Sequence, residues 1–225
     1  MDGAFDTGSL TALVGPNGAG KTTLLKTIAD LLRPETGQVD RRVPGDRIAY
    51  LPQQAEIDRT FPVRVRDMVE LGFWQRLGAF GGVSARQRRL AADTLAAVGL
   101  SGFAKRPIGS LSAGQFQRVL FARLLLQDAT VILLDEPFNA IDARTSADLL
   151  GVIARWHGEG RTVIAVLHDL EQVRAHFPRT LLMARTVIDW GPTDRVLRAE
   201  NLFRARQMAE AWDDAAAVCQ TELAG

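Results

Sequence analysis

Three short stretches of the chain are apolar, with little alternation between hydrophobic and polar positions. They are Leu10–Val14, Thr130–Leu134 and Thr162–Leu167. Uniform apolar character over so few residues predicts strands that are buried on both faces of a parallel sheet. Ligands of such sheets bind beyond the carboxyl ends of the strands. We therefore expect one shared site to include the residues that follow the three strands, namely Gly15, Asp135 and His168.

Helical periodicity replaces this pattern between residues 61 and 109. Two apolar stripes at helical spacing lie there, formed by Val65, Met68 and Val69 and by Ala91, Leu95 and Val98. The second stripe ends at Gly99, a typical helix stop. Residues 180–191 are predicted to form a hairpin, and a helix is predicted from Glu200 to Ala217. A chain of 225 residues fits one domain, and we divide it into a core (about 1–55 and 111–192), a helical insert (about 56–110) and a helical tail (about 193–225).

Charge and composition narrow the classes of function. The 27 basic and 26 acidic residues give a net charge of +1, which provides no bulk attraction to nucleic acid. We therefore expect no nucleic-acid partner. No stretch approaches the roughly twenty apolar residues of a membrane helix, and the start of the chain lacks the pattern of a signal peptide. The single cysteine, Cys219, excludes an internal disulfide and fits a reducing compartment.

A glycine-rich loop follows the first predicted strand, with the sequence Gly15-Pro16-Asn17-Gly18-Ala19-Gly20-Lys21-Thr22-Thr23. It fits the phosphate-loop pattern of two glycines four residues apart, then lysine and a hydroxyl residue. Backbone N–H groups of such a loop, together with the N-terminus of the next helix, form a nest for phosphate oxygens. Lys21 adds a charge near the terminal phosphates, and the Thr22 hydroxyl can ligate Mg²⁺. The loop indicates a nucleoside triphosphate; the alternative is a glycine-rich turn with a surface lysine.

The helix after this loop is predicted to extend to Arg33-Pro34, because proline stops a helix. Its core face is predicted to consist of Leu24, Leu25, Ile28 and Leu32.

A pair of carboxylates ends the second apolar stretch. Asp135 can hold the shell of a Mg²⁺ ion, and the adjacent Glu136 can orient or deprotonate an attacking water. The alternative is a core strand that runs into an acidic turn. Farther upstream, Ser112 and Gln115 stand at capping-box spacing at the start of an amphipathic helix. That helix start needs no ligand to explain it, but its glycine-relieved N-terminus can also bind an anion.

Taken together, these motifs strongly resemble the ATP-binding subunits of ABC transporters. The resemblance extends from Gly8 to about Leu202, and its motifs occur in the order of that family: the phosphate loop, Gln53 in Tyr50-Leu51-Pro52-Gln53, the signature Leu111-Ser112-Ala113-Gly114-Gln115, the pair Asp135-Glu136, Asp142, and His168 in Leu167-His168-Asp169. Six motifs in order are far more specific than one. The resemblance implies an α/β fold with a phosphate-loop (RecA-like) parallel-sheet core and an inserted helical subdomain.

The resemblance also implies a head-to-tail homodimer with ATP and Mg²⁺ at its interface. The nucleotide-binding residues would be Gly15, Asn17, Gly18, Ala19, Gly20, Lys21, Thr22 and Thr23 of one subunit and Ser112, Gly114 and Gln115 of the other. The metal would be held by Thr22, Gln53 and Asp135. In catalysis, Glu136 would be the general base, Gln53 would sense the metal and the attacking water, and His168 would hold the γ-phosphate.

Two features depart from the family pattern. Ala113 replaces a commoner glycine in the signature, a small change that we expect to be tolerated. Only fourteen residues precede Gly15, whereas family members carry an extra strand pair and an aromatic residue that stacks on adenine. Phe5 is too close to the loop to be that residue. We therefore expect the N-terminal antiparallel strands to be incomplete and the adenine platform to be missing or to lie upstream of Met1.

Two segments are most similar to the zinc and manganese importer group, namely residues 61–72 and 135–142. Siderophore, haem and cobalamin importers are the alternative; a soluble ABC ATPase or a phosphate-loop kinase or GTPase fits less well. An importer implies a polytopic permease as partner, a solute-binding protein reached through it, and a peripheral place on the cytoplasmic face of the membrane. We expect the permease to contact residues 54–80, which carry the aromatic residues Phe61, Phe73, Trp74 and Phe80.

Overall fold

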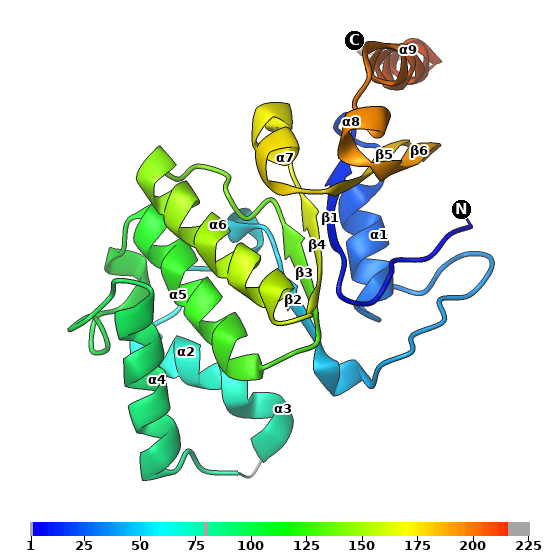
Figure 1. Cartoon of the computed structure of the whole chain (residues 1–225). Helices are drawn as coiled ribbons and strands as arrows, with labels where there is room; N and C mark the ends of the chain where they lie inside the picture. Colours follow the sequence, from blue (N-terminus) through cyan, green and yellow to red (C-terminus); the bar gives the residue numbers. More distant parts are fainter. Residues whose placement is uncertain (1, 79–80, 216–225) are drawn as a thin grey trace, which may run out of the picture.

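The chain is built on a six-stranded sheet in the order β2-β3-β4-β1-β5-β6 (Figure 1). A computed structural model describes residues 2–78 and 81–215. Within this part the strands are β1 (Leu10–Val14), β2 (Ile48–Leu51), β3 (Val131–Asp135), β4 (Thr162–Val166), β5 (Arg179–Ala184) and β6 (Thr186–Pro192). All neighbouring strands are parallel except β6, which forms an antiparallel hairpin with β5. The predicted strands and hairpin are therefore present.

Helices cover both faces of the sheet (Figure 1). Helix α1 contacts β3 from one face, whereas α5 and α6 contact β2 and β4. The described helices are α1 (Lys21–Ile28), α2 (Val65–Glu70), α3 (Trp74–Leu77), α4 (Ala85–Ala97), α5 (Ala113–Gln127), α6 (Ala143–Gly158), α7 (Leu170–His176), α8 (Thr193–Val196) and α9 (Ala199–Ala215), with short 3₁₀ turns η1 (Gly45–Arg47), η2 (Gln54–Glu56), η3 (Leu71–Phe73) and η4 (Ile108–Ser110). Helices α2 and α4 pack on α5 and form a helical subdomain. The predicted fold class is confirmed.

Two hydrophobic cores lie on opposite faces of the sheet, because successive strand residues point to opposite faces. In β1, Leu13 belongs to the core beneath α1, whereas Ala12 and Val14 belong to the larger core beneath α5 and α6. All five residues of β1 are buried. This double burial explains why the strands are uniformly apolar in the sequence.

Helix α1 is shorter than the sequence predicts. It ends at Ile28, and Asp30 adopts a left-handed conformation with φ of 64°. The Leu31 and Leu32 N–H groups then both donate to the Lys26 carbonyl, which reverses the chain. Leu32 is consequently 43% exposed. The expectation that Leu32 faces the core is wrong, because the helix ends before its last predicted turn.

The predicted aromatic surface of the insert is only partly present. Phe61 and Trp74 are 64% and 56% exposed, but Phe73 is buried in the core. Turn η3 can bury Phe73 because Gly72 approaches α5 closely: a Cβ at residue 72 would lie 2.5 Å from the Arg123 carbonyl oxygen. Core packing therefore explains Phe73, whereas Phe61 and Trp74 are exposed in the segment that we expect to contact the permease. Phe80, like Cys219 and the last ten residues of the tail, lies outside the described residues.

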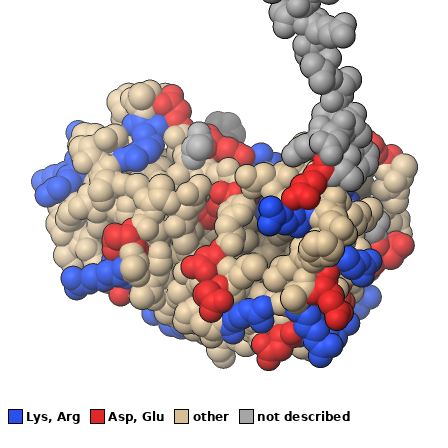
Figure 2. Space-filling view, turned by 90° about the horizontal axis from the view of Figure 1, so that it is seen from above, with Lys and Arg blue, Asp and Glu red and all other residues tan. Residues whose placement is uncertain are grey.

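Charged side chains of both signs lie on the surface (Figure 2), and the described part of the chain contains no membrane helix. Figure 2 shows acidic and basic side chains interspersed over one face of the molecule. Among residues 2–78 and 81–215, no helix is both long and apolar enough to cross a membrane. Residues 2–9 contain no strand, and the Phe5 ring packs against Trp190 of β6 with ring centroids 4.6 Å apart.

Candidate functional site

The loop between β1 and α1 requires its glycines. A Cβ at Gly15 would lie 1.9 Å from the Met183 carbonyl oxygen of β5, so only glycine fits there. Gly18 and Gly20 have φ values of 74° and 90°, which glycine adopts without a steric penalty. The turn of β5 and β6 also supports the loop, because the Arg185 N–H donates to the Ala19 carbonyl at 3.2 Å. These contacts therefore fix the backbone conformation of the loop, which bends around the start of α1.

Lys21 is the first residue of α1, and its side chain folds back onto the loop. Its Nζ donates to the carbonyl oxygens of Gly15 and Pro16, both at 2.9 Å. Burial lowers the pKa of the ammonium, and the nearby Glu136 and Asp135 carboxylates oppose that shift. Gly20 caps the helix without a side-chain hydrogen bond. The first N–H groups of a helix have no intrahelical partner, so this end of α1 can bind an anion.

Asp135 lies at the end of β3 beside the loop, with 1% of its surface exposed. The Thr22 hydroxyl donates to its Oδ1 at 3.2 Å, and the Tyr50 hydroxyl donates to its Oδ2 at 3.3 Å. Burial raises the pKa of the Asp135 carboxyl, while hydrogen bonds from Thr22, Gln53 and Tyr50 act in the opposite direction. Carboxylate and hydroxyl oxygens are the ligands that Mg²⁺ prefers, so these residues fit a magnesium site.

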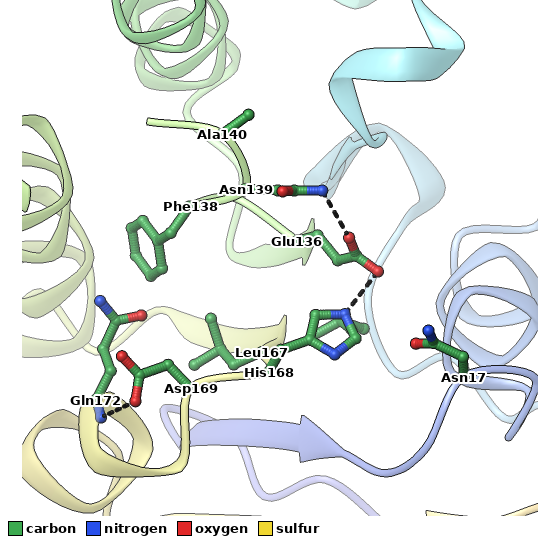
Figure 3. A pocket seen from close by; sticks show the side chains of 10 residues that line it. Asn17, Glu136, Phe138, Asn139, Ala140, Leu167, His168, Asp169 and Gln172 are labelled. Atoms are coloured by element: carbon green, nitrogen blue, oxygen red, sulfur yellow. Dashed lines mark hydrogen bonds and ion pairs between the residues drawn. The ribbon is translucent and has the colours of Figure 1, made fainter. Parts of the chain in front are cut away.

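Glu136 is held between two polar side chains (Figure 3). Its Oε1 lies 2.8 Å from His168 Nε2, and its Oε2 accepts from Asn139 Nδ2 at 3.2 Å. Its φ of 49° places a non-glycine residue in the left-handed region. Backbone strain of this kind clusters at functional sites.

These side chains line one cleft of about 630 Å³. Asn17 of the glycine-rich loop faces Glu136 and His168 across it (Figure 3). Segments that follow β1, β3 and β4 therefore meet at the carboxyl ends of parallel strands. A carboxylate, an imidazole and a phosphate-type loop around one cleft can bind a polyphosphate and activate a water.

The signature residues lie elsewhere, at the start of α5. Ser112 Oγ accepts from the Gln115 N–H at 3.2 Å, and Gln115 Oε1 accepts from the Ser112 N–H at 3.1 Å. Gly114 packs against α6, where an added Cβ would lie 3.2 Å from Thr145 Oγ1. In the described part of the chain, none of Ser112, Gly114 and Gln115 lines the cleft. These three residues thus lie at a different helix start from Lys21.

Asn139 and Tyr50 also belong to the site, although no sequence motif predicts a role for either. Asn139 bonds Glu136 across a tight turn, in which the Asn139 N–H also donates to the Glu136 carbonyl at 3.2 Å. Tyr50 pairs with Leu133 in the parallel register of β2 and β3, which directs its hydroxyl to Asp135. The one available signal for Tyr50 was a polar aromatic residue within a strand, three positions before Gln53.

A glycine-rich phosphate loop between a parallel strand and a helix defines a phosphate-loop protein. The ABC transporter family matches residues 1–139, more than half of the chain. The chain therefore belongs to the ABC transporter family, as an ATPase cassette.

Several curated relatives match most of the chain. The manganese transport system ATP-binding protein MntB of Listeria monocytogenes is 41% identical over 87% of this chain and 83% of its own length. The zinc transport system ATP-binding protein TroB of Treponema pallidum is 38% identical over 91% of this chain and 79% of its own length.

Solved structures agree with this assignment. A structure described as an inward-facing ABC transporter of the metal-chelate type has a TM-score of 0.79 and 30% identity, over 88% of this chain and 79% of that one. A bacterial ABC transporter cassette in dimeric form has a TM-score of 0.73 and 27% identity, over 84% of this chain and 88% of that one.

Proposed function

We propose that this chain is the ATP-hydrolysing subunit of an importer for manganese or zinc ions. The observation that carries the proposal is the position of Glu136, which follows the buried Asp135 and lies 2.8 Å from His168. Asp135 is in turn bonded to Thr22 of the phosphate loop. A general base, a polar partner and a phosphate-binding loop are thus combined in one place.

The proposal assigns phosphate-binding, metal-binding and catalytic roles to the residues of the site. Gly15, Asn17, Gly18, Ala19, Gly20, Lys21, Thr22 and Thr23 bind the phosphates of ATP. Thr22, Gln53 and Asp135 would hold a Mg²⁺ ion, which would neutralise charge on the β- and γ-phosphates. Glu136 accepts a proton from the attacking water, and His168 holds both the Glu136 carboxylate and the γ-phosphate. Lys21 exchanges its two backbone carbonyl partners for phosphate oxygens.

The second half of each site comes from a second copy of the chain. Ser112, Gly114 and Gln115 start a different helix from Lys21 and lie outside the cleft of their own subunit. A head-to-tail homodimer would place them on the nucleotide of the partner subunit. The dimeric form of the similar bacterial cassette supports this arrangement.

The proposed membrane partner is a polytopic permease, and through it a solute-binding protein. The helical insert, which we place at about residues 56–110 of a single domain, exposes Phe61, Leu71 and Trp74. Contiguous exposed apolar patches mark interaction sites, and in this proposal the three side chains contribute to one. The insert directly follows Gln53, so a conformational change caused by a contact on the insert can affect the nucleotide site. The chain would then lie on the cytoplasmic face of the membrane.

Relatives named for manganese or zinc transport match this chain at about 40% identity, which favours those ions over metal chelates. The ABC transporter described as metal-chelate type matches at 30% identity.

Glu136→Gln tests the proposal. The variant keeps the size of the side chain and one acceptor oxygen, but it lacks the base, so ATP turnover should fall by about 10²-fold or more. ATP affinity, measured by titration, should stay within about threefold. Glu171→Gln, an exposed change on α7, is the matched control and should retain full turnover. Turnover of Glu136→Gln within a few-fold of the parent would refute the assigned role.

The same assay with the reconstituted permease tests the solute. A binding protein loaded with Mn²⁺ or Zn²⁺ should stimulate turnover, and one loaded with a ferric siderophore should not. Stimulation by the siderophore alone would replace the metal-ion assignment with the alternative.

A further inference from the structure

A buried amide side chain connects three segments of the cassette. Gln117, on the second turn of α5, is 2% exposed. Its Oε1 accepts from Gln54 Nε2 at 2.7 Å, and its Nε2 donates to the Pro137 carbonyl at 2.7 Å. Gln54 Nε2 also donates to the Ala113 carbonyl in the first turn of α5, at 3.2 Å. A series of amide hydrogen bonds therefore connects Gln54 to α5 and α5 to Pro137.

The two outer residues of this hydrogen-bond network, Gln54 and Pro137, each directly follow a residue with a proposed role in hydrolysis. Gln54 directly follows Gln53, a proposed metal and water sensor. Pro137 is buried and directly follows Glu136, the proposed base. The Ala113 carbonyl belongs to the signature segment. The hydrogen bonds thus fix the start of α5 relative to both segments that flank the phosphates.

Packing alone does not require an amide at position 117. A buried polar group costs free energy unless it is hydrogen-bonded, and an apolar side chain of the same length would fill the space without that requirement. The Gln117 amide accepts one hydrogen bond on its oxygen and donates one from its NH₂ group, each at 2.7 Å. A fully satisfied buried network fixes one arrangement of the segments that it joins.

We propose that Gln117 is a positioning residue for ATP hydrolysis, which sets the turn of Glu136 against the glutamine loop and the signature helix. The proposal rests on the proposed function above. It differs from a role in stability, because it requires the hydrolytic step to depend on Gln117 more than nucleotide binding does. In this role Gln117 acts through Pro137 and Gln54.

Gln117→Met tests this role, since it keeps the length of the side chain and removes both hydrogen bonds. We expect kcat to fall about tenfold, because small displacements of a catalytic group have large effects on rate. The dissociation constant of ATP should stay within about twofold. Gln54→Met should lower kcat in the same way, and the double variant should lose little more than either single one, because both side chains belong to one network.

Thr94→Val is the matched control. Thr94 is a buried residue of α4, whose hydroxyl donates to the Leu90 carbonyl of its own helix at 2.7 Å. This variant should lower the urea midpoint but leave kcat within about twofold of the parent. The proposal fails if Gln117→Met behaves like Thr94→Val, or if both kcat and ATP affinity fall in parallel. Should Gln117→Met not fold, unchanged kcat in Gln54→Met would overturn it. Absence of turnover in the parent chain would instead refute the proposed function.

Discussion

Two helix N-termini in this cassette are proposed to bind phosphate, and they are built differently. Helix α1 begins after Gly20, which is in the left-handed conformation and provides no side-chain cap. Helix α5 begins after Ser112, which forms a complete capping box with Gln115. The N–H donors of α1 are thus left for a ligand, whereas two donors of α5 are already used within the chain.

The surroundings of the two helices explain this difference. The loop before α1 is fixed by the backbone of β5 at Gly15 and by the turn at Arg185. Its shape therefore does not depend on capping. The start of α5 is an ordinary helix start, and α4 begins with the same capping box at Ser84 and Gln87. We infer that α1 supplies a preformed half-site, whereas α5 binds a phosphate only when the partner subunit brings one to it.

Gly15→Ala should break the preformed half-site and have the largest effect. The new Cβ would overlap the Met183 carbonyl oxygen, so the loop and β5 would have to separate. We expect a loss of about 3 kcal/mol or more in the free energy of unfolding, measured by urea denaturation, together with loss of ATP binding.

Gly37→Ala is the matched control for Gly15→Ala. Gly37 has a φ of 78°, and an added Cβ would meet no atom within 4 Å. It should cost only about 1 kcal/mol from backbone strain. Equal losses for the two variants would show that the close approach at Gly15 does not matter.

Ser112→Ala and Ser84→Ala compare two helix starts of the same construction. Each removes one capping hydrogen bond, and each should cost about 1 kcal/mol in the free energy of unfolding. ATP turnover should fall roughly tenfold for Ser112→Ala, since the loss of a hydrogen bond to a charged phosphate raises the free energy of the transition state by about 1.5 kcal/mol. Ser84→Ala should leave turnover unchanged. If both variants hydrolyse ATP like the parent, the signature helix has no part in the reaction.

The comparison also shows how far sequence analysis could go. The phosphate loop was predictable because its glycines occupy positions where a Cβ would clash or where φ is positive. The strands were predictable because burial on both faces makes them uniformly apolar. The carboxylate pair, the glutamine and the histidine were recognised by their order along the chain. These features depend on residues that are close in sequence or on a repeated family pattern.

Contacts between distant segments could not be predicted in this way. Gln117 meets Gln54 and Pro137 across separations of 63 and 20 residues. Nothing local distinguishes a buried glutamine on an amphipathic helix from an exposed one. The burial of Phe73 likewise depends on Gly72 reaching α5, and the early end of α1 depends on Asp30 adopting a left-handed conformation.

Tyr50→Phe should have the smallest effect and should act on the α1 half-site alone. Tyr50 is the only tyrosine of the chain, and its hydroxyl donates to Asp135 Oδ2 at 3.3 Å from β2. Phenylalanine keeps the ring but leaves the buried carboxylate with one donor fewer, so the carboxylate is less firmly oriented toward a cation. A net loss of about 1 kcal/mol is typical for one hydrogen bond. The Mg²⁺ concentration for half-maximal turnover should therefore rise about threefold to fivefold, while turnover at saturating Mg²⁺ stays close to that of the parent. Ser84→Ala, which is remote from the cation, should leave this Mg²⁺ dependence unchanged. A Tyr50→Phe chain with the Mg²⁺ dependence of the parent would show that Thr22 and Gln53 orient Asp135 without help from β2.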